Sequence, residues 1–361
     1  MNNLGYDIDY IHVGNGEKGG DAIALRWGNL TTEPKWQKVV VIDGGFSDSG
    51  DLLVDHIRKY YGTDTVDLVI STHPDSDHIS GLTNVLENMK VGEILMHQPW
   101  KHTGGISDAF KDGRVTDNSI KDALKESLEQ ALTIEQLASK KGIRITEPFV
   151  GVTCFGGAMR IIGPTINYYE ELLPDFRGTP ESKDSSVLNT IFQGAASVVH
   201  KIAEDFNIET LDDNGETSAE NNSSTIILFT ISDECLLFTG DAGIPALAQA
   251  IELLENEGFD FNRIKFIDVP HHGSRRNVGP SVLDKIVGPK QAHDQKRKTA
   301  FVSAPISSSK HPSKKVMNAF RRRGAHVFTT NGQTIHHLKN SPDRPGWTSI
   351  EPIPFHNEVE E

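Results

Sequence analysis

The chain has 361 residues, of which 37% are hydrophobic, and a formal net charge of −14. This composition allows a sizeable core, and no apolar run is long enough to cross a bilayer, which argues against a membrane protein. The N-terminus shows no basic-then-apolar leader, so we expect a soluble, cytoplasmic protein. The negative net charge argues against nucleic acid as a partner unless basic residues gather in one segment.

The first half of the chain alternates apolar runs with amphipathic segments, which indicates a layered α/β fold. A glycine-rich turn at residues 14–20 joins the first two predicted strands. The predicted strands cover residues 8–13, 22–27, 39–42, 66–70 and 93–97. The predicted helices cover residues 52–61, 82–89 and 118–141.

The second half resumes this pattern after an interruption. Residues 165–222 break the rhythm, and we predict an insertion there, with a helix at 187–206 and an acidic end at 211–220. Strands are predicted at residues 149–155 and 158–162 before this interruption and at 225–230, 234–238, 263–269, 299–303 and 326–329 after it, with helices at 244–257 and 313–323. We therefore predict one domain over residues 1–345, followed by a peripheral tail at 346–361.

The most informative segment follows the predicted strand at 66–70. Two histidines and two carboxylates stand within six positions, at His73, Asp75, Asp77 and His78. Imidazole and carboxylate groups suit Zn²⁺ or Mn²⁺, and a strand that ends in a tight loop can aim alternate side chains at one point. The alternative is a polar turn in which Asp77 caps the next helix. We favour a metal site, because four ligand-type groups at this spacing exceed what a cap requires.

Further ligand-type residues follow predicted strands in the second half. They are Asp241, the adjacent pair His271 and His272, and His311. Taken singly, Asp241 is better explained as a helix cap, and each histidine as a structural or surface residue. Strand ends converge in layered sheets, however, so we expect these side chains to meet the first group. Together the donors suffice for two divalent ions with a bridging carboxylate, an arrangement that suits attack of an activated hydroxide on phosphorus.

The order of these motifs resembles the metallo-β-lactamase superfamily. The motifs are HPDSDH at 73–78, TGD at 239–241, HHGS at 271–274 and HP at 311–312. They are most similar to the branch typified by the hydrolase domain of ComEC-type DNA-uptake proteins, which also has features like HVGNG at 12–16, IDGG at 42–45 and NSS at 222–224. The resemblance covers roughly residues 8–335 without the insertion. It implies a four-layered αββα sandwich with a dinuclear metal site along one edge of the packed sheets.

Two departures from the superfamily's usual pattern change the expectation. Asp75 stands where the commonest first motif has a second histidine. The added negative charge should favour harder metals such as Mn²⁺ over a pure zinc preference, and by analogy it argues against β-lactam hydrolysis. In addition, the usual third motif before Asp241 has no clear histidine. His102 and His200 are available, but neither stands at a clear strand end.

The resemblance to the related phosphoesterase branch implies two ligand sets for Zn²⁺ or Mn²⁺. The first ion is held by His73, Asp75 and His272, the second by Asp77, His78 and His311, and Asp241 bridges them. Whether His271 or His272 is the ligand stays open. Asp77 and His271 are the candidate catalytic residues, with His271 steadying a phosphoryl oxygen or protonating the leaving group. Asp43 either orients a ligand imidazole or is only a turn residue.

Basic residues gather in residues 261–340, which hold sixteen Lys and Arg against three Asp. We predict that four residues beside the histidine motifs bind substrate phosphates, namely Ser274, Arg275, Arg276 and Lys310. The arginine run at 321–323 either extends this patch or is a solvated helix end. Trp100 either stacks on a base or packs in the core. The alternative for the whole segment is a set of solvated lysines on unrelated faces.

These features predict a metal-dependent phosphodiesterase, and specifically a nuclease that acts on DNA. A second hypothesis is a phosphoesterase for a small ligand, such as a cyclic nucleotide or a phosphocholine-like ester, with the acidic insertion as a lid. A third is a non-catalytic binding module that keeps metals as scaffold. The full ligand set argues against this third hypothesis, because a scaffold needs no open coordination positions.

Overall fold

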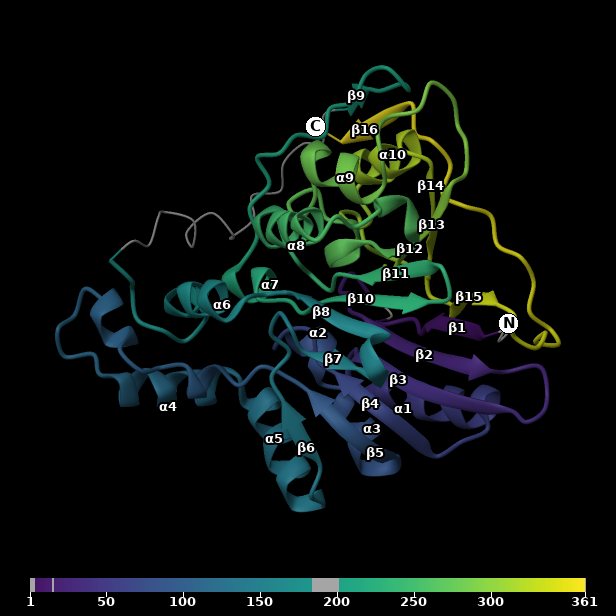
Figure 1. Ribbon diagram of the computed structural model, residues 1–361. Helices are drawn as coiled ribbons and strands as arrows, with labels where there is room; N and C mark the ends of the chain where they lie inside the picture. Colours follow the sequence, from purple (N-terminus) through teal and green to yellow (C-terminus); the bar gives the residue numbers. More distant parts are fainter. Residues whose placement is uncertain (1–3, 15, 184–200, 361) are drawn as a thin grey trace.

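The computed structural model describes residues 4–14, 16–183 and 201–360. Two seven-stranded sheets pack face to face, and helices cover the outer face of each sheet (Figure 1). Three apolar clusters follow from this layering, one between the two sheets and one between each sheet and its own helices. The predicted four-layered αββα sandwich is confirmed.

The first sheet contains the N-terminal strands and the strand that leads into the HPDSDH motif. Its order is β15-β1-β2-β3-β4-β5-β6, antiparallel from β15 to β3 and parallel from β3 to β6. The strands are β1 Gly5–Tyr10, β2 Ala22–Asn29, β3 Trp36–Gly44, β4 Thr65–Ile70, β5 Lys90–Leu95, β6 Arg144–Thr146 and β15 Ile335–Lys339. Its helices are α1 Ser47–His56, α3 Leu82–Asn88, α4 Asp117–Ser127 and α5 Glu129–Lys141.

The second sheet is built mainly from the second half of the chain. Its order is β14-β13-β12-β11-β10-β8-β7. The strands are β7 Thr153–Cys154, β8 Met159–Gly163, β10 Ile226–Ile231, β11 Glu234–Phe238, β12 Ile264–Asp268, β13 Lys298–Val302 and β14 Ala325–Thr329. Its helices are α8 Ile244–Asn256, α9 Pro280–Ile286 and α10 Lys314–Arg322. Across the described residues, no helix combines the length and the apolar character needed to cross a bilayer.

Burial on both faces explains why the central strands are apolar throughout. In β3, Val39 and Val41 join the cluster on the helix side, whereas Val40 and Ile42 join the cluster between the sheets. Successive side chains of a strand point to opposite faces, so a strand that is covered on both sides needs an unbroken apolar run. The same burial fixes where each strand ends and its polar loop begins.

Some predicted elements differ from the structure. The helix predicted at 118–141 is two helices, because the backbone at Leu128 (φ −114°, ψ 41°) leaves helical geometry between α4 and α5. Of the strand predicted at 149–155, only Thr153–Cys154 forms β7. The strands β6 and β15 were not predicted, because they are short or polar and depend on pairing with distant strands.

The predicted insertion and the C-terminal tail meet in the structure. Residues 187–200 of the predicted insertion helix lie outside the described residues. Lys201–Ala203 form the strand β9, which pairs antiparallel with β16 Glu358–Glu360 near the end of the chain. The division into one domain at 1–345 with an insertion at 165–222 stays a prediction.

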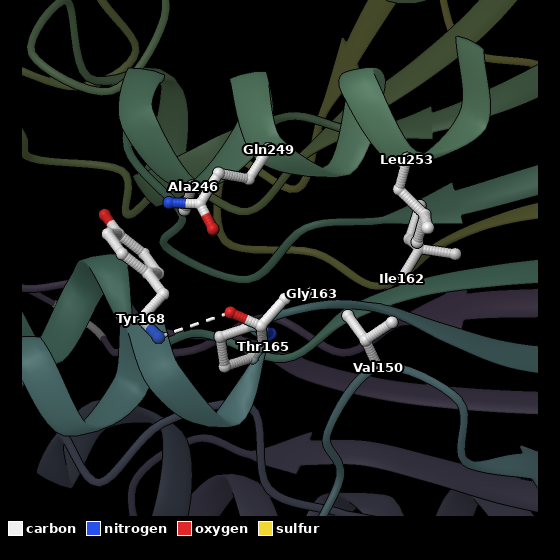
Figure 2. Close-up of a pocket in the computed structure, with 9 residues that line it drawn as sticks. Val150, Ile162, Gly163, Thr165, Tyr168, Ala246, Gln249 and Leu253 are labelled. Carbon is white, nitrogen blue, oxygen red and sulfur yellow. Dashed lines mark hydrogen bonds between the residues drawn. The ribbon is translucent and has the colours of Figure 1, made fainter. Parts of the chain in front are cut away.

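A small cavity of about 40 Å³ lies between α6 Ile166–Leu172 and α8 (Figure 2). Its walls are largely apolar and include Ile162, Tyr168, Ala246 and Leu253. None of the predicted metal ligands lines this cavity. The candidate functional site therefore lies elsewhere.

Candidate metal centre

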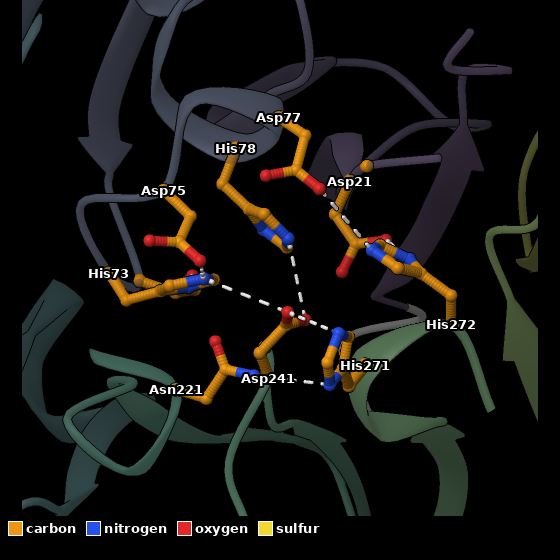
Figure 3. Close-up of polar contacts among 12 residues, drawn as sticks. Asp21, His73, Asp75, Asp77, His78, Asn221, Asp241, His271 and His272 are labelled. Atoms are coloured by element: carbon orange, nitrogen blue, oxygen red, sulfur yellow. Dashed lines mark hydrogen bonds and ion pairs between the residues drawn. The ribbon is translucent and has the colours of Figure 1, made fainter. Parts of the chain in front are cut away.

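The loops that follow β4, β11 and β12 direct ligand-type side chains toward one point (Figure 3). Asp77 and His78 lie on the short helix α2 Ser76–Ile79, which continues the loop after β4. The side chains that meet are His73, Asp75, Asp77, His78, Asp241, His271 and His272. The two sheets thus bring together residues that are far apart in the sequence.

Two glycines allow the loops to approach this closely. A Cβ atom on Gly20 would lie 2.0 Å from the carbonyl oxygen of Asp77, and one on Gly240 would lie 2.9 Å from the Cβ of Thr72. Gly240 also has a φ of 50°, which glycine adopts without strain. Glycine at these positions therefore lets the turn before β2 and the loop after β11 reach the HPDSDH segment.

Asp241 is the centre of this group and is almost fully buried. Its Oδ1 lies 3.4 Å from Nε2 of His78, and its Oδ2 lies 3.7 Å from Nε2 of His73 and 3.6 Å from Nε2 of His271. The two carboxylate oxygens thus face different imidazoles. A carboxylate in this position can bridge two cations.

Hydrogen bonds behind the group fix how the imidazoles of His73 and His78 are oriented. Nδ1 of His78 lies 2.8 Å from Oδ2 of Asp43, which also accepts a hydrogen bond from Oγ1 of Thr72 at 2.6 Å. The same Thr72 oxygen lies 3.0 Å from Nδ1 of His73. Since both Nδ1 atoms are engaged, both Nε2 atoms face Asp241. Asp43 therefore orients a candidate ligand imidazole.

The loop after β12 sends two adjacent histidines to different sides of the group. His271 and His272 both adopt left-handed backbone geometry, with φ values of 47° and 54°. Such geometry costs a non-glycine residue about 1–3 kcal/mol and is concentrated at functional sites. Nε2 of His272 lies 3.8 Å from Oδ2 of Asp77, and its Nδ1 lies 3.5 Å from Oδ1 of Asp21.

Buried polar atoms without a hydrogen-bond partner gather in this group. Within the part of the chain that the structure describes, they include Nε2 of His73, Nε2 of His78, Oδ1 of Asp241 and both ring nitrogens of His272. Three triads have ligand atoms within 4.8 Å of one another: Asp43, His73 and His78; Asp77, His78 and His272; and Asp21, His78 and Asp241. An unpartnered buried polar atom costs about 1–3 kcal/mol, and a bound cation removes that cost. The donor set therefore fits a divalent metal.

The ligands group differently from the expectation. His272 lies with Asp77 and His78, whereas His271 shares the neighbourhood of Asp241 Oδ2 with His73. Which ion His272 would hold stays a prediction, although its nearest ligand-type neighbours are those of the second predicted set. The left-handed backbone at His271 and His272 explains this grouping. It determines on which side of the group each of the two imidazole rings lies.

The predicted roles of two other histidines stay predictions. Nε2 of His271, the candidate proton donor, faces Asp241 and its Nδ1 lies 2.9 Å from Oδ1 of Asn277. The ring centroid of His311 lies 5.8 Å from that of His271 and 6.4 Å from that of His272. Among the described residues His311 belongs to none of the three triads, but its Nδ1 is buried without a hydrogen-bond partner, and its role as a ligand stays a prediction.

The carboxylates make the group attractive to a cation. Burial lowers the pKa of His78, but Asp241 and Asp43 outweigh burial and raise this pKa well above its usual 6.5. Burial and the neighbouring His78 lower the pKa of His73 to about 4. Burial raises the pKa of Asp241, but His271 and His78 outweigh it and hold this pKa well below its usual range. At neutral pH, Asp241 is therefore charged and His73 offers a free lone pair.

The residues predicted to bind substrate phosphates differ in exposure. Arg275, Arg276 and Lys310 are exposed. Ser274 is buried, and its Oγ accepts a hydrogen bond from the backbone N of Arg276 at 3.2 Å. Its hydroxyl therefore stabilises the loop after β12. Trp100 is buried in the cluster on the helix side of the first sheet, and it therefore packs in the core.

The arginine run at 321–323 is not a surface patch. The side chains of Arg322 and Arg323 are 0% exposed. Arg322 pairs with Glu204 at 3.0 Å, and Arg323 pairs with Glu209 at 2.6 Å. Both expectations for this run, an extended patch and a solvated helix end, are wrong for these two residues. A buried charge requires a partner, and here the partners come from the acidic segment after β9.

Besides Thr72, four residues that contact the group were not predicted from the sequence. They are Asp21, Arg177, Asn221 and Asn277. Asp21 follows two glycines and directly precedes a strand, and this position of an acidic residue was a usable signal. The other three are ordinary polar residues of loops and short helices, and nothing in their local sequence distinguishes them.

Comparison with known proteins gives a partial match. Residues 36–134 match the family model of the metallo-beta-lactamase superfamily. Among curated proteins, none matches the sequence. The structure of unliganded yeast PDE1 is 12% identical, with 90% of this chain and 97% of that chain covered and a TM-score of 0.42. A diphosphatase from the PhnP family (10% identity, 93% and 98% covered) and a long form RNase Z from yeast (11%, 91% and 41%) both have TM-scores of 0.38.

Proposed function

We propose that this chain, which carries a metallo-beta-lactamase superfamily domain, is a metal-dependent hydrolase of phosphodiester bonds that acts on DNA. The proposal depends on one observation, the buried imidazole and carboxylate atoms around Asp241 that lack hydrogen-bond partners within the described residues. The order of the motifs further supports a ComEC-type branch.

Two groups of residues that share Asp241 would hold two divalent ions, Zn²⁺ or Mn²⁺. The first group adds His73, Asp75 and His271, and the second adds Asp77, His78 and His272. When bound, ions of this kind neutralise charge on phosphoryl oxygens and bring the pKa of a water ligand close to 7.

The chain's own residues prepare the imidazoles for this role. The Asp43 carboxylate accepts a hydrogen bond from Nδ1 of His78 at 2.8 Å, which turns Nε2, the atom that a cation would bind, toward Asp241. Asn277 lies 2.9 Å from Nδ1 of His271 and fixes that ring in the same way. Ligands that are already oriented need little reorganisation when charge develops in the reaction.

Exposed cations support an anionic polymer as the substrate. Arg275 and Arg276 follow His271 in the chain, and Lys310 precedes His311. Three such contacts predict that affinity for double-stranded DNA falls about 40-fold between 50 and 200 mM salt, at a slope of about 0.9 per contact. A small phosphodiester engages fewer of these cations and should depend on salt much less.

The test is hydrolysis by the purified chain loaded with Mn²⁺ or Zn²⁺. The substrates are plasmid, single-stranded DNA, RNA and bis-p-nitrophenyl phosphate. We expect cleavage of DNA and of the small diester, and a loss of roughly 100-fold or more in the variant Asp77→Ala/His78→Ala. The variant Asp55→Ala, which changes an exposed carboxylate on α1, should keep full activity.

The outcomes separate the hypotheses. Cleavage of bis-p-nitrophenyl phosphate with intact DNA and RNA would replace DNA by a small phosphodiester as the substrate. Activity that survives in Asp77→Ala/His78→Ala would place the reaction outside this group of residues. If every substrate stays intact with both metals, the proposal is wrong and a binding module becomes the better hypothesis.

A further inference from the structure

Arg177, in the segment after α6, reaches the predicted ligand Asp75. Its Nη2 donates a hydrogen bond to Oδ1 of Asp75, and its Nε lies 3.4 Å from Oε1 of Glu220. The side chain of Arg177 is 44% exposed and that of Asp75 is 26% exposed, whereas that of Glu220 is only 7% exposed. The guanidinium thus extends from a buried carboxylate toward the solvent side of the metal-ligand group.

The backbone at Arg177 is fixed from several directions. Its N donates a hydrogen bond to Oε1 of Glu220 at 2.6 Å, and its carbonyl oxygen accepts one from Oγ of Ser127 at 2.9 Å. The preceding Phe176 is buried in the cluster on the helix side of the first sheet. A side chain held in this way loses less conformational entropy when it binds a ligand.

The segment that holds Arg177 also touches the histidines. Glu220 lies on α7 Ala219–Asn222, and the next residue, Asn221, has its Nδ2 3.1 Å from Nδ1 of His271. One short helix therefore contacts both the guanidinium and a candidate ligand imidazole. The position of Arg177 relative to the group is fixed by this shared contact.

We infer that Arg177 binds a non-bridging oxygen of the substrate's phosphate group, an inference that rests on the proposed function and adds its anion-binding residue. A guanidinium has five N–H donors in a planar fork, so it can hold Asp75 and a phosphoryl oxygen at the same time. The carboxylates Asp75, Asp77 and Asp241 take up much of the charge of the two ions, so a further cation beside them strengthens the attraction for an anion. The cation thus comes from the segment that the sequence analysis treated as an insertion.

The test compares Arg177→Gln and Arg177→Lys with the control Arg114→Gln. Arg114 is 90% exposed and pairs with Asp112 at 2.7 Å, so the control makes the same chemical change at a surface ion pair. Each protein is loaded with Mn²⁺, and its metal content and melting temperature are measured. Binding of inorganic phosphate is then followed by titration calorimetry, and kcat and KM are determined with bis-p-nitrophenyl phosphate.

We expect Arg177→Gln to weaken phosphate binding and to lower kcat/KM, each by about 10- to 100-fold, since a hydrogen bond from a charged group is lost. Metal content and melting temperature should not change. Arg177→Lys should recover part of the loss, because lysine keeps the charge but not the fork. Arg114→Gln should behave like the unmodified chain.

Two results would overturn the inference, and a third would separate it from the proposed function. Phosphate affinity within twofold of the unmodified chain in Arg177→Gln overturns it. Loss of bound metal in both Arg177 variants also overturns it, because the arginine would then position Asp75 instead of binding substrate. If the unmodified chain cleaves no phosphodiester, the proposed function fails by itself, and the phosphate titration alone decides the role of Arg177.

Discussion

The substitution Asp43→Asn tests how much the ligand imidazoles depend on the residues behind them. Asp43 accepts hydrogen bonds from Nδ1 of His78 at 2.8 Å and from the backbone N and Oγ1 of Thr72 at 2.8 and 2.6 Å. Asparagine has the same shape and tolerates the left-handed φ of 54° at this position. Its NH₂ group, however, would donate to Nδ1 of His78 and move the ring proton to Nε2, the atom that lies 3.4 Å from Asp241 Oδ1.

The cost of this change can be estimated. A protonated Nε2 has no lone pair for a cation, so a metal would first have to shift the tautomer of His78. Loss of a hydrogen-bonded group behind a ligand histidine typically weakens metal affinity 10- to 100-fold, which corresponds to about 1.4–2.7 kcal/mol. We expect the Kd for Mn²⁺ to rise by this factor.

The assay is titration calorimetry of Mn²⁺ into chelator-treated protein near neutral pH. Asp55→Asn makes the same chemical change at an exposed position of α1 and should leave the affinity unchanged. The melting temperature of metal-free Asp43→Asn should fall, because Asp43 helps to raise the pKa of His78 and its charge is lost, so the affinity is measured at a temperature where the variant is folded. An affinity of Asp43→Asn within twofold of the unmodified chain would refute the reasoning.

Three further predictions concern stability. Arg322→Ala should lower the free energy of unfolding, measured by urea denaturation, by about 3–5 kcal/mol, because it leaves Glu204 buried without its cation. The control Arg297→Ala, at an exposed position, should change this free energy by less than about 0.5 kcal/mol. A hydrogen bond with Glu147 outweighs burial and raises the pKa of His102, so its stabilising effect is complete below about pH 6.5 and is lost as the pH rises through the raised pKa. His102→Gln should therefore destabilise the protein more at about pH 6 than at about pH 9, and an equal loss at both would contradict this. Chelation should lower the melting temperature, since metal at 100 times its Kd adds about 2.7 kcal/mol, and an unchanged value would argue against a metal centre.

Strands that are buried on both faces were predictable from the sequence. β11 has the predicted bounds, and β4 starts one residue before its predicted start, because their apolar runs are set by burial alone. β15 escaped prediction because its sequence, IHHLK, is largely polar and its pairing with β1 is made across the whole chain. The break at Leu128 was not predicted either, since the apolar periodicity of the sequence continues from α4 into α5.

The candidate ligands were predictable as a set but not as two groups. Strand ends converge in any layered sheet, so residues that follow strands could be expected to meet. The sides on which His271 and His272 lie depend on two left-handed φ values, which no local pattern indicates. The partners of Arg322 and Arg323 were equally invisible, because Glu204 and Glu209 lie more than a hundred residues earlier in the chain.

The acidic segment before β10 changes how the charge asymmetry should be interpreted. From sequence, the basic excess at 261–340 indicated a nucleic-acid surface, and the acidic residues indicated a solvated insertion. In the structure, Glu204 and Glu209 neutralise two buried arginines of that basic segment, and Glu220 holds Arg177 against the metal-ligand group. Some of the arginines in residues 261–340 thus form ion pairs inside the fold. Fewer basic side chains are left at the surface to contact phosphates. The salt dependence of DNA binding is therefore expected to have the slope of about 2.7 that the three exposed cations give, and only a slope near zero would favour a small substrate.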